Sequence, residues 1–164
     1  MKADIVVIGG GMVGLAAALQ CAQLGFRVVI IETVCPQPVD LKQYALRVSA
    51  ISLASQRLFA ELGAWDAMCA QRVSPYQNMV VWDAHSTGEI TLTAQEAHVE
   101  ELGHIIENAV IQQALWEQAE QHENITVLAP AKWRQLHHKA EGWHVALDVG
   151  ESVSARLVIV ADGD

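Results

Sequence analysis

The stretch IVVIGGGMVG, residues 5–14, decides the fold of this chain. An apolar run leads into a glycine turn, an Ala/Leu-rich helical stretch follows, and a second apolar run at residues 28–31 ends at Glu32. This order of strand, glycine turn, helix, strand and acid is typical of the βαβ unit that binds the ADP half of a dinucleotide. The sequence therefore predicts an α/β fold that begins with a Rossmann-like nucleotide-binding unit.

Each glycine of the turn has its own expected role. Gly9 permits the tight turn out of the strand, Gly11 leaves room for backbone to approach a pyrophosphate, and Gly14 lets the helix pack close to the sheet. The first N–H groups of the helix and the positive end of its dipole would face the phosphates. Glu32 stands where a carboxylate accepts both hydroxyls of the adenosine ribose. Its charge would repel a 2′-phosphate, which argues against NADP at this site.

Composition indicates a globular protein with one ordinary core. The chain has 164 residues, of which 52% are hydrophobic and 18% are charged. A net charge of −9 and the lack of a Lys/Arg run argue against a nucleic-acid partner. Cys21, Cys35 and Cys69 fit no metal or CxxC spacing, so we expect reduced thiols in a cytoplasmic protein and no metal site.

Periodicity after the first unit predicts a mixed α/β domain with antiparallel strands added to the parallel start. Residues 35–44 are expected to form a loop. Helical spacing covers residues 52–68, with a stop at Gly63, and a second amphipathic helix covers residues 108–122. The remaining apolar runs are expected to be strands, at residues 79–82, 90–93, 125–128, 132–138, 143–147 and 154–160.

Several single residues carry simpler expectations. Trp65, Trp82 and Trp116 are expected in the core. His104 is expected to be solvated or to cap a turn, and Asn108 to be the N-cap of the second helix, with cofactor contact as the alternative. The chain closes with ARLVIVADGD at residues 155–164, a strand followed by Asp-Gly. A buried parallel strand normally continues into a turn and a helix, so we expect a shortened chain.

The sequence resembles the N-terminal part of the single-component, FAD-dependent aromatic hydroxylases of ubiquinone biosynthesis. Beside the glycine turn, the resemblance rests on RVSAIS at residues 47–52 and GHIIEN at residues 103–108, which are more specific. Shorter matches lie at residues 62–65, 81–83, 114–116 and 155–159. Full-length members of the family also carry a later Gly-Asp motif at the flavin ribityl and pyrophosphate and most of the substrate-binding sheet, and neither is present in residues 1–164.

The resemblance implies FAD as the cofactor and assigns its parts to residues. The pyrophosphate would lie on Gly9, Gly11, Met12, Val13 and Gly14. Glu32 would bind the adenosine ribose and Val127 would line the adenine pocket. Arg47 would lie on the flavin side, where a fixed guanidinium can face phosphate oxygens. Asp162 belongs to an Asp-Gly pair that supports the cofactor and is linked to NAD(P)H use; Val160 and Asp164 depart from the family pattern around it.

The reaction implied by the resemblance is hydroxylation of a polyprenylated phenol or quinol, with NAD(P)H as co-substrate for the flavin. It assigns no catalytic residue. Residues 1–164 would be the N-terminal part of the FAD-binding domain, with residues 73–104 as an insertion on the substrate side. The chain alone is expected to lack hydroxylase activity. Peripheral association with a membrane or a ubiquinone-biosynthesis complex stays open, and a severed sheet edge favours self-association.

Two other functions remain open from the residues alone. The glycine turn equally permits an NAD-binding dehydrogenase domain, which would continue as a parallel βαβ series. The strand-rich region 132–160 argues against that series. The second alternative is a non-catalytic, truncated nucleotide-binding domain.

Overall fold

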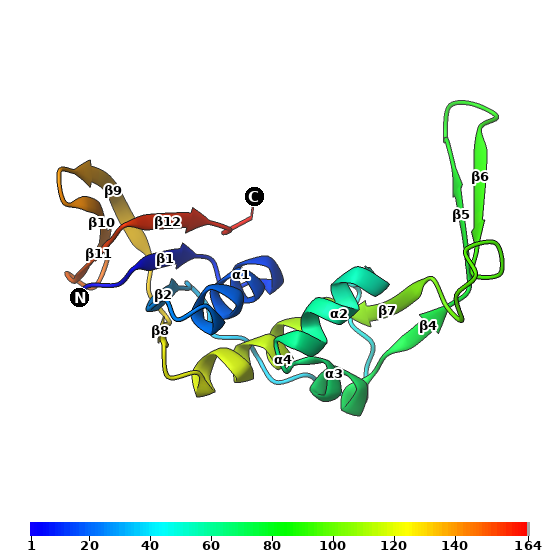
Figure 1. Cartoon of the computed structure of the whole chain (residues 1–164), viewed down its shortest axis with the longest axis horizontal. Helices are drawn as coiled ribbons and strands as arrows, with labels where there is room; N and C mark the ends of the chain where they lie inside the picture. The colour runs from blue at the N-terminus through cyan, green and yellow to red at the C-terminus, as the bar shows by residue number, and fades with distance from the viewer. Residues whose placement is uncertain (164) are drawn as a thin grey trace.

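A four-stranded parallel sheet lies toward one end of the molecule, a computed structural model that describes residues 1–163 (Figure 1). Its strands run in the order β12-β1-β2-β8, and all neighbours are parallel. The strands are β1 (Ile5–Ile8), β2 (Val28–Ile31), β8 (Ile125–Leu128) and β12 (Leu157–Val160). Every residue of β1 and β2 is buried, because layers cover both faces of the sheet. The predicted βαβ start is confirmed.

Two helices cover one face of this sheet. They are α1 (Met12–Gln23) and α4 (Asn108–Gln121), close to the helices that the sequence predicts. Alternate strand residues such as Val7 and Ile30 pack against Leu15 of α1 and Leu115 of α4 in one buried cluster. The two helices therefore form one layer on this face of the sheet.

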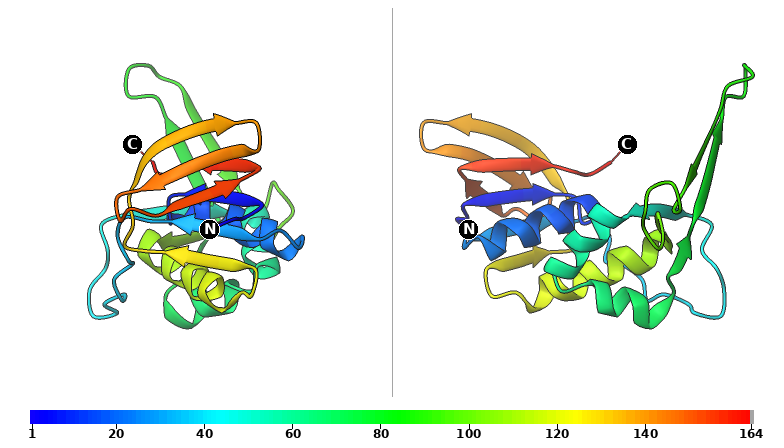
Figure 2. Two further views of the ribbon diagram at one scale, coloured as in Figure 1. Left: turned by 90° about the vertical axis from the view of Figure 1, so that its left-hand side faces the viewer. Right: turned by 45° about the vertical axis from the view of Figure 1, so that its right-hand side comes forward.

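An antiparallel sheet covers the opposite face, which gives the three layers visible in Figure 2. It has the order β11-β10-β9, formed by β9 (Trp133–Lys139), β10 (Gly142–Leu147) and β11 (Ser152–Ala155). The other alternate strand residues, such as Val6 and Val29, pack there against Val145 and Val153. This layer confirms the predicted antiparallel additions.

The predicted single strand at residues 154–160 is wrong, because the chain changes sheets within it. β11 belongs to the antiparallel sheet and β12 to the parallel sheet. The backbone N–H groups of Arg156 and Leu157 both donate to the Asp4 carbonyl, at 3.1 and 3.2 Å. That shared acceptor marks the corner between the two strands.

A second antiparallel sheet, which the sequence analysis does not predict, joins the two specific motifs. Its order is β3-β7-β4, formed by β3 (Val48–Ser52), β7 (Gly103–Glu107) and β4 (Ser74–Tyr76). Val48 pairs with Glu107 and Ser52 with Gly103. The RVSAIS and GHIIEN segments are thus neighbouring strands.

The predicted helical segment 52–68 is two helices, α2 (Leu53–Glu61) and α3 (Trp65–Gln71). Gly63 separates them with a φ of 76°, and the next N–H, of Ala64, donates to the Phe59 carbonyl at 2.9 Å. A left-handed glycine is a common end for a helix, so the predicted stop is confirmed. No helix within residues 1–163 has the length and apolar character needed to cross a bilayer.

A hairpin of β5 (Asn78–Trp82) and β6 (Glu89–Thr93) projects from the rest of the molecule (Figure 1). Both strands are predicted. Trp82 is 69% exposed, so its expected place in the core is wrong. The reason is that the described residues supply no layer over the hairpin, whereas Trp116 is buried under the loop beside α4.

Candidate nucleotide-binding site

The glycine turn leaves the carboxyl end of β1 in a conformation that only glycine adopts easily. Gly9 has a φ of 106°, and its N–H donates to the Ile31 carbonyl at 2.9 Å. A Cβ on Gly9 would collide with the Ala161 carbonyl and would lie 2.8 Å from the Asp162 Cα. The turn is therefore tight and lies directly against the end of β12, with Gly9 in its predicted role.

The start of α1 faces open space. Gly11 is its N-cap, and a Cβ on Gly11 would meet no atom within 4 Å. Met12 is half-buried and Val13 is 70% exposed. The first turn of α1 carries no acidic residue, and no side chain caps it. Its N–H groups are thus free to meet an anion, as the sequence predicts.

Gly14 allows the close approach between α1 and the turn. It is buried, and a Cβ there would collide with the Gly9 carbonyl and lie 3.3 Å from Cγ1 of Val7. This agrees with the predicted role of Gly14 in packing the helix start close to the sheet.

Glu32 lies directly after β2 and points at the glycine turn. Its Oε2 accepts a hydrogen bond from the Gly10 N–H, and its Oε1 accepts from Thr33 Oγ1 at 3.0 Å and from the Val34 N–H at 2.9 Å. Burial raises the pKa of the Glu32 carboxyl, but the N–H donors of Val34 and Gly10 and the donors of Thr33 outweigh it, so the pKa is below its ordinary value. The site therefore holds a fixed negative charge at neutral pH.

A hollow of about 200 Å³ brings Asp162 beside the turn and the acid. Gly9, Glu32 and Asp162 line it together with Lys132 and Trp133. No pattern in the sequence marks Lys132, which adds one positive charge to a hollow lined by two carboxylates. Asp164, one of the two departures from the family pattern, lies outside the described residues.

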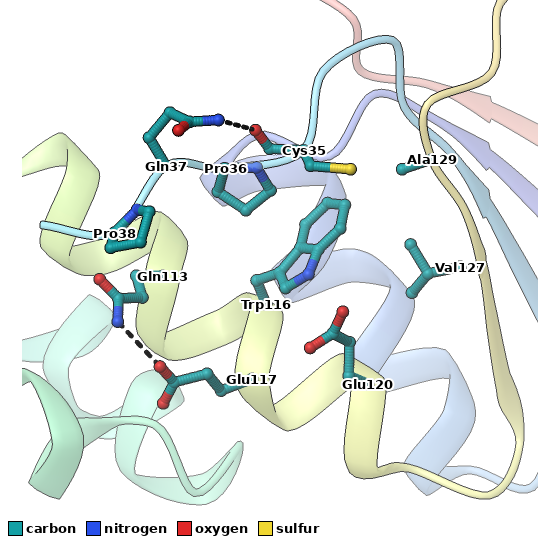
Figure 3. A pocket seen from close by; sticks show the side chains of 10 residues that line it. All are labelled: Cys35, Pro36, Gln37, Pro38, Gln113, Trp116, Glu117, Glu120, Val127 and Ala129. Atoms are coloured by element: carbon teal, nitrogen blue, oxygen red, sulfur yellow. Dashed lines mark hydrogen bonds between the residues drawn. The ribbon is translucent and has the colours of Figure 1, made fainter.

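A second hollow of about 340 Å³ lies between α4 and the carboxyl end of β8 (Figure 3). Val127, which the resemblance assigns to the adenine pocket, is one of the residues that line it. Figure 3 shows the Trp116 ring reaching from α4 into this hollow. The same ring lies against the glycine turn, since its Cζ3 would be 2.8 Å from a Cβ on Gly10. Trp116 thus joins the turn to the hollow. Polar side chains of α4 that the sequence analysis missed also line it: Gln113, Glu117 and Glu120.

Arg47 lies apart from these groups, at the entrance to β3. It is exposed, and its carbonyl accepts the Asn108 N–H at 3.0 Å. The N-cap of α4 is Glu107, so the predicted capping role of Asn108 is wrong. Asn108 Oδ1 instead accepts a 2.7 Å hydrogen bond from Ser49 Oγ, because β3 runs beside the helix start.

An ion pair between the half-buried Arg72 and the buried Glu107, here called the clamp, holds the loop that precedes Arg47. Arg72 Nε lies 3.1 Å from Glu107 Oε1, a distance for an ion pair, although the N–H is not aligned for a hydrogen bond. Glu107 is only 5% exposed, and its Oε2 accepts the Ala45 N–H at 2.7 Å. Arg72 Nη2 donates to the Gln43 carbonyl at 2.8 Å. No pattern in the sequence points to this pair, apart from the acid Glu107 directly after the apolar residues Ile105 and Ile106.

His104 is buried in β7, so its predicted solvated or capping role is wrong. Its Nε2 lies 3.1 Å from Glu101 Oε1, and the centroids of its ring and the Trp65 ring are 5.0 Å apart in an edge-to-face arrangement. The cause is that β7 is the central strand of its sheet.

The parallel sheet, the glycine turn at its carboxyl edge and the acid after β2 define a dinucleotide-binding domain. The chain belongs to the family described as glucose inhibited division protein A (GIDA), whose model matches residues 4–164.

Comparison with curated proteins confirms the predicted resemblance. The chain is 42% identical over 161 residues to 3-demethoxyubiquinol 3-hydroxylase of Escherichia coli (strain K12), covering 98% of the chain and 41% of that protein. It is 34% identical over 161 residues to ubiquinone hydroxylase UbiL of Rhodospirillum rubrum, covering 98% of the chain and 37% of that protein. The chain thus spans about two fifths of the length of these relatives.

Solved structures share the fold at low sequence identity. p-Nitrophenol 4-monooxygenase PnpA from Pseudomonas putida DLL-E4 matches with a TM-score of 0.76 and 18% identity, over 99% of this chain and 41% of that one. The flavin-dependent monooxygenase PieE, solved with FAD and substrate, matches with a TM-score of 0.76 and 16% identity, over 99% of this chain and 30% of that one. The predicted mixed α/β class is confirmed.

Proposed function

We propose that this chain holds the ADP end of FAD in a flavin-dependent hydroxylase of ubiquinone biosynthesis. The names of its curated relatives support the pathway. The observation that carries the proposal is the contact between Glu32 and the Gly10 N–H beside the open start of α1. It joins a ribose-binding acid to a phosphate-binding turn, which is the pairing that the ADP half of a dinucleotide requires.

The turn fits a pyrophosphate. The space around Gly11 is open, and the start of α1 offers N–H groups without a competing side chain. In this proposal the phosphates lie against the turn and the helix start, on Gly9, Gly11, Met12, Val13 and Gly14. These residues bind and orient the cofactor, and the flavin supplies the redox chemistry when bound.

Glu32 is suited to the adenosine ribose. Each oxygen of an ionised carboxylate accepts more than one hydrogen bond, so Glu32 can accept the ribose hydroxyls and keep its bonds to Gly10 and Val34. A 2′-phosphate would place a second negative charge beside it. NADP is therefore disfavoured at this site. FAD, and not NAD, is assigned to it because the curated relatives are ubiquinone-pathway hydroxylases.

Three further residues complete the assignment. Val127 would contact the adenine, since it lines the hollow that Trp116 joins to the turn. Asp162 would support the cofactor from beside Gly9. Arg47 would face the flavin side, which the clamp on its loop supports.

The whole protein would use NAD(P)H and O₂ to hydroxylate a polyprenylated phenol or quinol. Residues 1–164 would form the first part of its FAD-binding domain, with residues 73–104 on the substrate side. The position of the hairpin on the substrate side is supported by its exposed apolar side chains, since an isolated hairpin needs a covering layer to be stable. These side chains are Val80, Val81, Trp82, Ile90 and Leu92. We propose that the protein is cytoplasmic and associates peripherally with a membrane or with a biosynthetic complex. Because the apolar side chains of the hairpin are exposed, we expect the isolated chain to self-associate.

An NAD-binding dehydrogenase domain is the competing function. It would continue directly as parallel βαβ units. Here the chain leaves the parallel sheet after β2, forms a separate antiparallel sheet and returns through α4 to β8. That path argues against the dehydrogenase.

Titration of the chain with FAD, ADP, NAD and 2′-phosphorylated ADP tests the proposal. FAD and ADP are expected to bind, and the 2′-phosphate is expected to weaken ADP binding about tenfold or more, since like charges in close contact cost over 1 kcal/mol. Tight binding of NAD without binding of FAD or ADP would contradict it.

A further inference from the structure

We propose that Gln112 is a positioning residue of the nucleotide site, because its side-chain amide holds the Gly10–Gly11 peptide with the Gly11 N–H turned toward the phosphates. This inference rests on the proposed function. The residue lies on α4, far in sequence from the turn, and no motif in the sequence marks it.

The geometry follows from one hydrogen bond. Gln112 Nε2 donates to the Gly10 carbonyl at 2.7 Å, and the contact is partly buried. In a planar trans peptide the C=O and the following N–H point in opposite directions. Because the Gly10 carbonyl points to α4, the Gly11 N–H points away from α4. A Cβ on Gly11 would meet no atom within 4 Å, so the approach to that residue is open.

The hydrogen bond from Gln112 to the Gly10 carbonyl, here called the latch, can fix the orientation of this peptide. Such a bond matters here because both residues of the peptide are glycines. Without Cβ atoms, the peptide between Gly10 and Gly11 rotates with little steric resistance. A flipped peptide would turn its carbonyl toward the anion and withdraw an N–H donor. Repulsion would then replace attraction at the pyrophosphate.

The preceding peptide is held from the other side. The Gly10 N–H donates to Glu32, and the Trp116 ring packs against Gly10. Gln112 and Trp116 are one helical turn apart and share a face of α4. The turn is therefore fixed between the end of β2 and one face of α4, and Gln112 supplies the bond that sets the orientation of the second peptide.

A simple structural role for Gln112 makes a different prediction. If the bond only joined α4 to the turn, its loss would weaken adenosine and ADP equally. If Gln112 orients the peptide, its loss weakens ADP, which carries the pyrophosphate, and leaves adenosine nearly unchanged. The ratio of the two dissociation constants separates the roles.

The test measures the Kd of ADP and of adenosine for the wild-type chain, Gln112→Leu, Gln112→Glu and the control Gln118→Leu. Gln118 is on the same helix but lies beside Gly63. Gln112→Leu is expected to weaken ADP about tenfold, the size of one hydrogen bond, and adenosine less than about twofold. Gln112→Glu keeps the shape but puts an acceptor against the Gly10 carbonyl, so it is expected to weaken ADP further. The control is expected to match the wild type.

The outcomes are distinct. An unchanged ratio of ADP to adenosine affinity in Gln112→Leu would overturn the latch while the proposed function stands. Should Gln112→Leu fail to fold, the uncharged Gln112→Met takes its place, because the negative charge of Gln112→Glu would repel the phosphates of ADP in either case. Failure of the wild-type chain to bind ADP would overturn the proposed function itself, and the latch with it.

Discussion

The substitution Gly14→Ala tests how closely α1 approaches the turn. In an ordinary helix interior, alanine is more favourable than glycine by about 1 kcal/mol. Here the added Cβ would collide with the Gly9 carbonyl, a backbone atom that cannot rotate away, and would press on Val7. Overpacking of this kind costs about 1–3 kcal/mol. An overpacking cost of about 3 kcal/mol, less the gain of about 1 kcal/mol from helix propensity, gives a net loss of stability of about 2 kcal/mol.

For a domain of this size, that loss corresponds to a fall in Tm of about 4–8 °C. Thermal unfolding followed by circular dichroism measures it, and Gly11→Ala is the matched control. Gly11 has a φ of −76° and an open Cβ position, so its alanine variant is expected to fold nearly as well as the wild type. Its methyl group would occupy the space for the pyrophosphate, so ADP binding is expected to fall. A Gly14→Ala chain as stable as the wild type would refute the reasoning.

Three further predictions concern charge and exposure. Arg72→Ala leaves the buried Glu107 without its cation and is expected to lower the free energy of unfolding, measured in urea, by about 3 kcal/mol. The control Arg27→Ala removes an exposed ion pair and is expected to lower it by at most about 1 kcal/mol. Equal losses in the two variants would count against the clamp. Because the folded pKa of Glu32 is lowered, its charge stabilises the fold above the ordinary value of 4.5, and this is lost as the pH falls through the folded pKa. The stability difference between wild type and Glu32→Gln is therefore expected to shrink in acid, and a difference independent of pH would contradict this. Trp82→Ser is expected to change stability by less than about 0.5 kcal/mol and to weaken self-association in light scattering, whereas a large loss of stability would mean that Trp82 is covered.

The local parts of the fold are readable from the sequence. The βαβ start is specified within about thirty neighbouring residues, whose apolar runs, glycines and terminal acid all agree. The hairpin of β5 and β6 and helix α4 follow from periodicity in the same way. Gly63 marks a helix end through its freedom to adopt a positive φ.

Contacts between distant segments are not readable in this way. The pairing of RVSAIS with GHIIEN joins strands that show no clear alternation, as β3 buries only Ile51 fully. The corner at Arg156 depends on the Asp4 carbonyl at the other end of the chain. Gln112 and Lys132 reach the candidate site only through the packing of α4 and the entry to β9. Trp82 shows that residue type alone does not predict burial. It is apolar but 69% exposed, because the described residues supply no layer that covers it.

A crystal structure of the chain grown with excess FAD tests the central claim most directly. We predict that the pyrophosphate lies against Gly11 and the start of α1, the adenosine ribose on Glu32 and the adenine beside Val127. An empty glycine turn, or an adenosine whose ribose lies away from Glu32, would contradict it.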